Sequence, residues 1–92
     1  MSDILEQLLA TLQERKANPR PESYTARLLA AGEDEIVKKI GEEAIEVILA
    51  AKGQDNQRIV EETADLLYHI LVLLVARDLT WADVKAELVR RQ

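Results

Sequence analysis

Residues 66–76 read LLYHILVLLVA, and this apolar run decides the class of fold. It belongs to a longer helical pattern that we expect to begin at Asn56 or Gln57 and to end near Arg77. The run is too short to cross a membrane. A soluble helix that is apolar on all sides must be covered on all sides, and the short helices that remain in a 92-residue chain hardly suffice. We therefore expect this helix to pack against its copy in a homodimer.

Apolar residues keep a helical spacing through the rest of the chain, and strand signals are absent. The stretch 17–22 contains Pro19 and Pro21 and is expected to be a linker, because proline interrupts a helix. We expect four further helices, at residues 3–16, 23–29, 33–52 and 80–90. The sequence thus predicts one all-α domain over residues 1–92, a helical bundle of four to five helices that homodimerisation completes.

The expected helix boundaries follow from capping residues. Either Ser2 or Asp3 is placed to cap the first helix, and Ser23 the second. Thr80 and Asp83 have the spacing of a capping box at the start of the last helix. Gly32 is expected to end the helix of residues 23–29, and Gly53 to end the helix of residues 33–52, because glycine is common just after the last helical residue.

Composition narrows the classes of function. The chain has 17 acidic and 12 basic side chains, a net charge of −5 and no cysteine. It lacks the basic footprint of general nucleic-acid binding, so we expect no nucleic-acid partner. The N-terminal residues lack the basic start and apolar run of a signal peptide, and the absence of cysteine fits a reducing compartment. We expect a cytoplasmic protein with no membrane partner.

Five acidic residues stand out by their spacing: Glu42, Glu43, Glu46, Glu62 and Asp65. Glu43 and Glu46 are three residues apart on one expected helix, and Glu62 and Asp65 repeat this spacing on the next. Two antiparallel helices joined by a short turn would bring these pairs face to face. Glu43 falls within the apolar stripe of its helix, and Glu62 and Asp65 lead into the apolar run, so we expect these acids to face inward.

Carboxylates on inward faces indicate a bound cation. Burial of a charge costs free energy, and clustered like charges raise one another's pKa. An all-oxygen ligand set favours a hard cation, Mg²⁺ or Mn²⁺, over zinc. Magnesium keeps several waters and shares its other positions with phosphate oxygens, so such a site is suited to nucleotide hydrolysis. The alternative is that these acids are solvated surface, as most glutamate pairs on helices are.

The pattern Glu42-Glu43-x-x-Glu46, fifteen residues, then Glu62-x-x-Asp65 resembles the signature of the all-α nucleoside triphosphate pyrophosphohydrolases. Three stretches are similar to the phosphoribosyl-ATP pyrophosphatase family within that superfamily, namely residues 23–29 (SYTARLL), 38–43 (KKIGEE) and 64–74 (ADLLYHILVLL). This resemblance covers nearly the whole chain. It implies a magnesium-dependent homodimer that hydrolyses phosphoribosyl-ATP to phosphoribosyl-AMP and pyrophosphate, the second step of histidine biosynthesis.

The resemblance also implies the roles of single residues. It places metal ligands at Glu43, Glu46, Glu62 and Asp65. Glu42 matches the first acid of the signature and is expected to be catalytic with Glu43, as an outer acid, a second-metal ligand or a proton acceptor for the attacking water.

Phosphate and substrate contacts are expected around the start of the second helix and one turn before the acids: Ser23, Tyr24, Thr25, Arg27, Lys38 and Lys39. One of the two lysines is expected to be only a solvated surface residue, and Ser23 can instead be a simple cap. Glu22 departs from the family pattern, because it puts a negative charge beside a phosphate contact.

His69 either orients the Asp65 carboxylate or is a buried histidine that is hydrogen-bonded within the dimer core. Tyr68 is expected to be a packing residue.

Two other functions compete with this reading. One is a house-cleaning pyrophosphatase of the same fold that acts on dUTP, dCTP or an altered nucleotide. The other is a non-catalytic helical dimerisation module, which would explain the apolar helix but not the inward acids.

Overall fold

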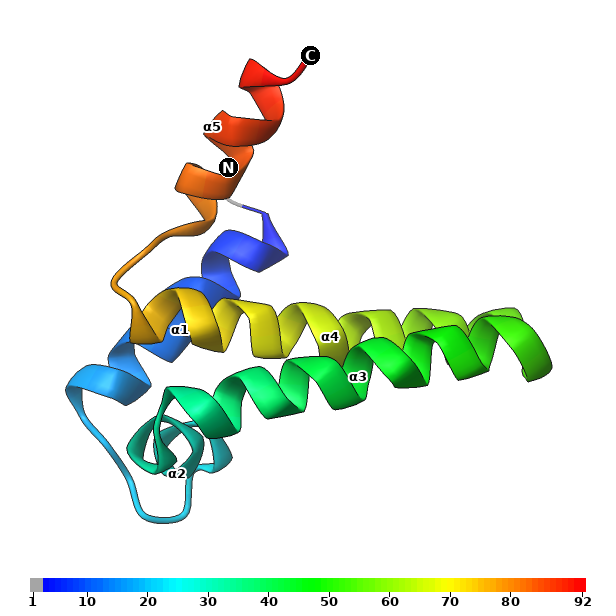
Figure 1. The fold of residues 1–92 in the computed structure, drawn as a ribbon. Coiled ribbons are helices and arrows are strands. Elements are labelled where there is room, and N and C mark those ends of the chain that lie inside the picture. The colour runs from blue at the N-terminus through cyan, green and yellow to red at the C-terminus, as the bar shows by residue number, and fades with distance from the viewer. Residues whose placement is uncertain (1–2) are drawn as a thin grey trace.

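The computed structural model describes residues 3–92, which form five helices and no strand (Figure 1). The helices are α1 (Ile4–Ala17), α2 (Tyr24–Ala31), α3 (Glu33–Gly53), α4 (Asn56–Ala76) and α5 (Trp81–Arg90). The all-α prediction is confirmed, and each expected boundary lies within two residues of the observed one. Within the described residues, no helix combines the length and apolarity needed to span a membrane.

Side-chain caps determine where the helices begin. Asp3, Ser23 and Asp55 each accept a hydrogen bond from the backbone N–H three residues ahead, at 2.9, 3.1 and 3.0 Å. Thr80 and Asp83 form the expected capping box at the start of α5. These bonds satisfy N–H groups that have no partner within the helix. Ser2, the other candidate cap of α1, lies outside the described residues.

Gly32 is the single residue between α2 and α3. Its φ is 104°, a conformation that glycine adopts without the steric cost that a side chain would add. The chain therefore reverses direction abruptly, and α2 lies across the beginning of α3 (Figure 1). This junction brings the N-terminal end of α2 close to the acidic face of α3.

The hydrophobic core lies at one end of the molecule, where α1 and α2 pack against the start of α3 and the end of α4. Its buried members are Leu9, Leu12, Leu28, Ile36, Leu71, Val72, Leu74 and Val75. Trp81 and Val84 of α5 pack against this cluster from the outside. The second half of α4 supplies half of the buried cluster, but only five of the eleven residues in the run 66–76 are buried and the other six are half-buried.

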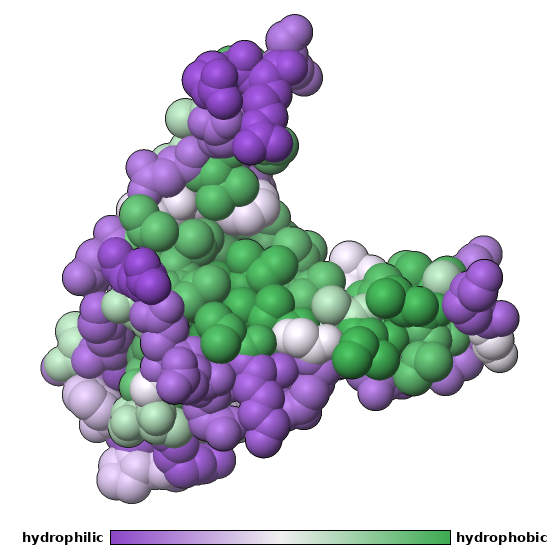
Figure 2. Space-filling model, in the orientation of Figure 1, coloured by the Kyte–Doolittle hydropathy of each residue, from purple (hydrophilic) through white to green (hydrophobic). Residues whose placement is uncertain are grey.

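The α3–α4 hairpin projects beyond the other helices (Figure 1). The radius of gyration is 14.2 Å, against about 12.3 Å for a compact chain of this length. Four apolar side chains on the projecting part are more than half exposed: Ile45, Ile48, Leu49 and Val60. Figure 2 shows apolar surface there and across the middle of the same face. The expected packing of α4 against its copy stays a prediction, and the exposed apolar surface extends to this end of the hairpin.

We predict that Leu71→Ala destabilises the protein by about 2–5 kcal/mol, because Leu71 is 0% exposed and its truncation leaves a cavity. Val89→Ala, at a side chain that is 70% exposed on α5, is expected to change stability by about 0.5 kcal/mol or less. Urea unfolding of both variants tests this. Equal effects of the two substitutions would contradict the assignment of the core.

Candidate functional site

Three of the predicted acids meet between α3 and α4. One carboxylate oxygen each from Glu43, Glu62 and Asp65 lies within 4.8 Å of the other two. Glu43 comes from the middle of α3, and the three-residue spacing places Glu62 and Asp65 on one face of α4. Glu62 is buried and Glu43 is half-buried, as expected for inward acids. Asp65 is exposed, contrary to that expectation, so the cluster is open to solvent at this residue.

This cluster has the chemistry of a site for a hard divalent cation. All three donors are carboxylate oxygens, the ligands that Mg²⁺ prefers. Two oxygens bound to one Mg²⁺ at 2.0–2.1 Å are at most about 4.2 Å apart. Among three oxygens on one octahedral Mg²⁺, at most one pair is opposite and the other pairs are adjacent at about 3.0 Å, so carboxylates spread over up to 4.8 Å have to rotate closer together to bind one ion.

Arg58 supplies positive charge beside the buried acid. Its guanidinium group donates a hydrogen bond to Glu62 at 2.5 Å and also pairs with Glu61. The hydrogen bond to Glu61 and the charge of Glu62 raise the pKa of Arg58. A buried carboxylate without a partner is costly, so Arg58 neutralises Glu62 within the chain itself. The sequence carried a signal for this pair in its four-residue spacing on one helix, but Arg58 is not among the residues predicted for the site.

The other two acids of the pattern lie outside the three-residue group. Glu46 is exposed one turn after Glu43, and no hydrogen bond or ion pair within residues 3–92 engages its carboxylate. Glu42 is also exposed, and its carboxylate lies 4.0 Å from the Nζ of Lys39. Their roles, Glu46 as a metal ligand and Glu42 as an auxiliary acid, stay predictions.

His69 connects the start of α2 to the acid cluster. Its Nδ1 lies 2.8 Å from the backbone oxygen of Asp65, and its Nε2 lies 2.9 Å from the hydroxyl of Tyr24. Because a carbonyl oxygen only accepts, Nδ1 carries the proton, and Nε2 of the neutral ring accepts from Tyr24. His69 is buried and holds the Asp65 backbone rather than its carboxylate. The burial and the hydrogen bonds agree with the second expected role, and the place of His69 in a dimer core stays a prediction.

Tyr24 lies between α2 and the acidic face of α3. Desolvation raises the pKa of its phenol, the charge of Lys39 lowers it, and the charges of Glu43 and Glu42 raise it further. With its pKa raised, the phenol stays protonated at neutral pH and can donate to His69. Tyr24 is thus a predicted substrate contact that lies close enough to Glu43 and Glu42 for their charges to act on it.

The two predicted lysines are separated in the structure. Lys39 is one-third exposed, and it acts electrostatically on Tyr24 and lies beside Glu42. Lys38 is 66% exposed and lies 4.0 Å from Glu35 instead. Lys39 is therefore the one that faces the site, which matches the expectation that only one lysine does.

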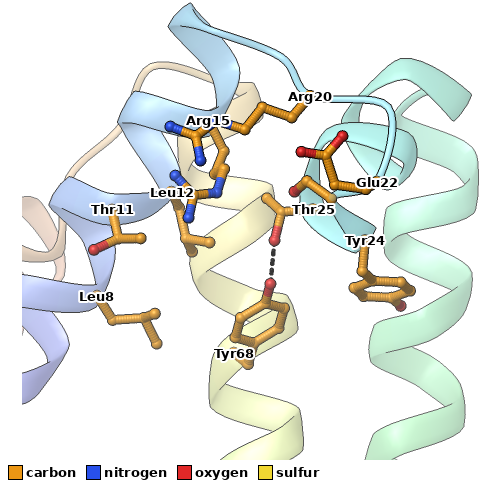
Figure 3. Close-up of a pocket in the computed structure, with 10 residues that line it drawn as sticks. Leu8, Thr11, Leu12, Arg15, Arg20, Glu22, Tyr24, Thr25 and Tyr68 are labelled. Atoms are coloured by element: carbon orange, nitrogen blue, oxygen red, sulfur yellow. Dashed lines mark hydrogen bonds between the residues drawn. The ribbon is translucent and has the colours of Figure 1, made fainter.

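Ser23 and Thr25 line a pocket at the start of α2, whereas Arg27 does not (Figure 3). Ser23 is a helix cap and Thr25 is buried, with its hydroxyl hydrogen-bonded to that of Tyr68. Arg27 donates to the backbone oxygen of Pro21 at 3.0 Å and lines a separate hollow. Tyr68, expected only to pack, thus also fixes Thr25.

We predict that Arg58→Gln lowers the melting temperature, because it leaves Glu62 buried without a counter-charge. Added Mg²⁺ is expected to raise the melting temperature of this variant more than that of the wild type, because the cation then supplies the missing charge. Thermal melts with and without Mg²⁺ measure both effects. The control is Arg90→Gln, which removes a surface pair with Glu87. The same magnesium response in both variants and the wild type would contradict this role of Arg58.

Comparison with known proteins places this chain in a family. A family model described as phosphoribosyl-ATP pyrophosphohydrolase matches residues 5–92. Phosphoribosyl-ATP pyrophosphatases of Bacillus mycoides and Bacillus thuringiensis are 50% and 47% identical over 99% of this chain and 85% of their own length. The histidine biosynthesis bifunctional protein HisIE of Gloeobacter violaceus is 53% identical, and this chain spans 41% of its length. The chain therefore belongs to the phosphoribosyl-ATP pyrophosphohydrolase family, as the motifs in its sequence indicated.

Proposed function

We propose that this protein hydrolyses phosphoribosyl-ATP to phosphoribosyl-AMP and pyrophosphate, the second step of histidine biosynthesis, with Mg²⁺ as its cofactor. The observation that carries the proposal is the cluster of Glu43, Glu62 and Asp65 beside Tyr24, in a chain of this family. Curated relatives that match nearly the whole chain bear the name of this activity. Mn²⁺ is a chemically equivalent substitute at an all-oxygen site.

The acidic residues of the cluster are the proposed cation ligands. Glu43, Glu62 and Asp65 would hold the cation, and Glu46, exposed one turn after Glu43, would be a further ligand. When bound, the cation neutralises charge on the phosphate oxygens and lowers the pKa of a bound water. Arg58 then no longer has to balance the charge of Glu62 alone.

The residues around the cluster position the triphosphate and the attacking water. Lys39 donates to phosphate oxygens and neutralises part of their charge. Glu42, held beside Lys39, accepts the proton that the water loses as its oxygen attacks phosphorus. The bond that breaks joins a bridging oxygen to phosphorus, and the products are phosphoribosyl-AMP and pyrophosphate.

A homodimer is the proposed active form, in the cytoplasm. Ile45, Ile48 and Leu49 are between 51% and 59% exposed on one projecting helix, and Val60 faces solvent on the next. Contiguous exposed apolar surface of this kind marks an interaction site on a soluble chain. A second copy would cover it, and the small core of a 92-residue chain would benefit from the added burial.

We predict that Asp65→Asn lowers turnover of phosphoribosyl-ATP by more than about 100-fold, because it removes a direct cation ligand. Asp65 is exposed, so the variant is expected to fold. Asp34→Asn is the matched control, an exposed acid near the start of α3, about 13 Å along the helix from Glu43. Pyrophosphate release is the measurement.

A substrate panel separates this activity from that of a house-cleaning enzyme. Wild-type protein is expected to prefer phosphoribosyl-ATP over ATP, dUTP and dCTP. A preference for an ordinary triphosphate would reject the proposed substrate, and no pyrophosphate release with any of them would favour the non-catalytic module.

We predict that Ile48→Asp converts the dimer to a monomer, because a charge cannot be buried unpaired in an apolar interface. Ala30→Asp, on the exposed side of α2, is expected to leave the dimer intact. Analytical ultracentrifugation distinguishes the two states. If wild-type protein sediments as a monomer, the proposed dimer is wrong.

A further inference from the structure

A pocket of about 350 Å³ lies between α1, the start of α2 and α4, and Tyr24 is one of the residues that line it (Figure 3). Tyr24, Thr25 and Tyr68 form one wall, and α1 supplies the apolar wall through Leu8 and Leu12. Its volume is at the lower end of the range for small-molecule pockets. It therefore suits one part of a nucleotide substrate rather than the whole.

Two arginines give this pocket a basic end. Arg15 lies in the last turn of α1 and Arg20 in the following loop, and Figure 3 shows their side chains next to each other. Both are held by the same carboxylate, since Glu14 pairs with Arg15 and lies 3.7 Å from Arg20. A guanidinium group has five N–H donors, so each keeps donors free after contacting Glu14. Two adjacent guanidinium groups are the usual recognition element for a phosphate group.

Glu22 places a carboxylate at the rim of the same pocket (Figure 3). A carboxylate only accepts hydrogen bonds when it is ionised, so it repels phosphate but binds hydroxyl groups. Acidic side chains in nucleotide sites commonly accept from the ribose hydroxyls. Arginines at one end and a carboxylate at the rim thus match a molecule that carries both a phosphate and a sugar.

The position of Tyr24 relates this pocket to the acid cluster. Tyr24 lines the pocket, donates to His69, and His69 holds the backbone of Asp65. The charges of Glu43 and Glu42 act on the Tyr24 phenol, so a ligand that extends from the pocket past Tyr24 approaches the acids of α3 while its other end faces the arginines. Phosphoribosyl-ATP is such a ligand, because it carries a triphosphate at one end and a 5-phosphoribosyl group at the other.

We propose that the pocket between α1 and the start of α2 binds the phosphoribosyl end of the substrate. Arg15 and Arg20 bind its 5-phosphate, and Glu22 accepts hydrogen bonds from its ribose hydroxyls. The proposal rests on the proposed function and adds to it a site for substrate selection. Ordinary nucleoside triphosphates lack this group and leave both arginines without a ligand. Glu22, which departs from the family pattern, thereby has a role on the sugar.

Steady-state kinetics of Arg15→Gln and Arg20→Gln test the proposal. Each substitution removes charge-assisted hydrogen bonds to phosphate, so KM for phosphoribosyl-ATP is expected to rise by about 10- to 100-fold. The kcat is expected to change by less than about threefold, because the acid cluster is intact. Arg15→Lys should restore part of the affinity, since it keeps the charge but not the planar pair of donors. The control is Arg90→Gln, for which KM is expected to stay unchanged.

Ribose 5-phosphate provides a readout that does not depend on turnover. Wild-type protein is expected to bind it in isothermal titration calorimetry, and Arg15→Gln and Arg20→Gln to weaken this binding at least about 10-fold. Wild-type affinity in both variants would overturn the proposal even if phosphoribosyl-ATP is the substrate. If phosphoribosyl-ATP is not hydrolysed but ribose 5-phosphate binds through the arginines, the proposed function fails and the pocket assignment stands. Arg20 is an exposed loop residue, so its variant keeps the test valid if Arg15→Gln unfolds.

Glu22→Ala separates the two possible effects of this carboxylate. If Glu22 accepts from the ribose, KM for phosphoribosyl-ATP is expected to rise by about 3- to 10-fold. If Glu22 only repels the phosphate, removing its charge lowers KM, and that result would overturn its assignment to the sugar.

Discussion

The packing of α3 against α4 holds three carboxylates within 4.8 Å of one another, and the rest of the structure is organised around this unfavourable arrangement. Like charges at such distances repel, so the hairpin needs the core at its other end to hold it closed. Ile36, Leu71 and Val72 supply that core and are almost fully buried. Arg58 offsets part of the repulsion at Glu62. The free energy of apolar burial thus maintains a site that is suited to a cation.

The hydrogen bonds around His69 connect this cluster to α2, which carries several of the predicted substrate contacts. The ring nitrogens bond to Tyr24 and to the backbone of Asp65, so the placement of α2 and the placement of the acid are linked. Gly32 makes this possible, because its positive φ allows α2 to turn back across α3 within one residue. Tyr24 also lines the pocket of Arg15 and Arg20, and under the proposal the site then has a basic end and an acidic end.

Apolar surface is distributed unevenly along the hairpin. The end near α1 and α2 is buried, while Ile45, Ile48 and Val60 remain exposed where the hairpin projects. A chain of 92 residues has too few helices to cover both ends. Assembly with a second copy is the proposed solution, and it places the acid cluster between the core of one chain and the surface offered to its partner.

The sequence by itself determined the helices, because caps, glycines and the 3.6-residue period are local signals. It also determined the facing acids, since a short turn between two long helices leaves few other arrangements. Tertiary structure alone decided which residues lie together. Lys39 rather than Lys38 lies beside Glu42, Arg15 and Arg20 share Glu14, and Arg27 does not line their pocket. It also showed that His69 holds a backbone oxygen and that Asp65 is exposed. Local periodicity says which face of a helix a residue occupies, but the angle between helices decides what that face meets.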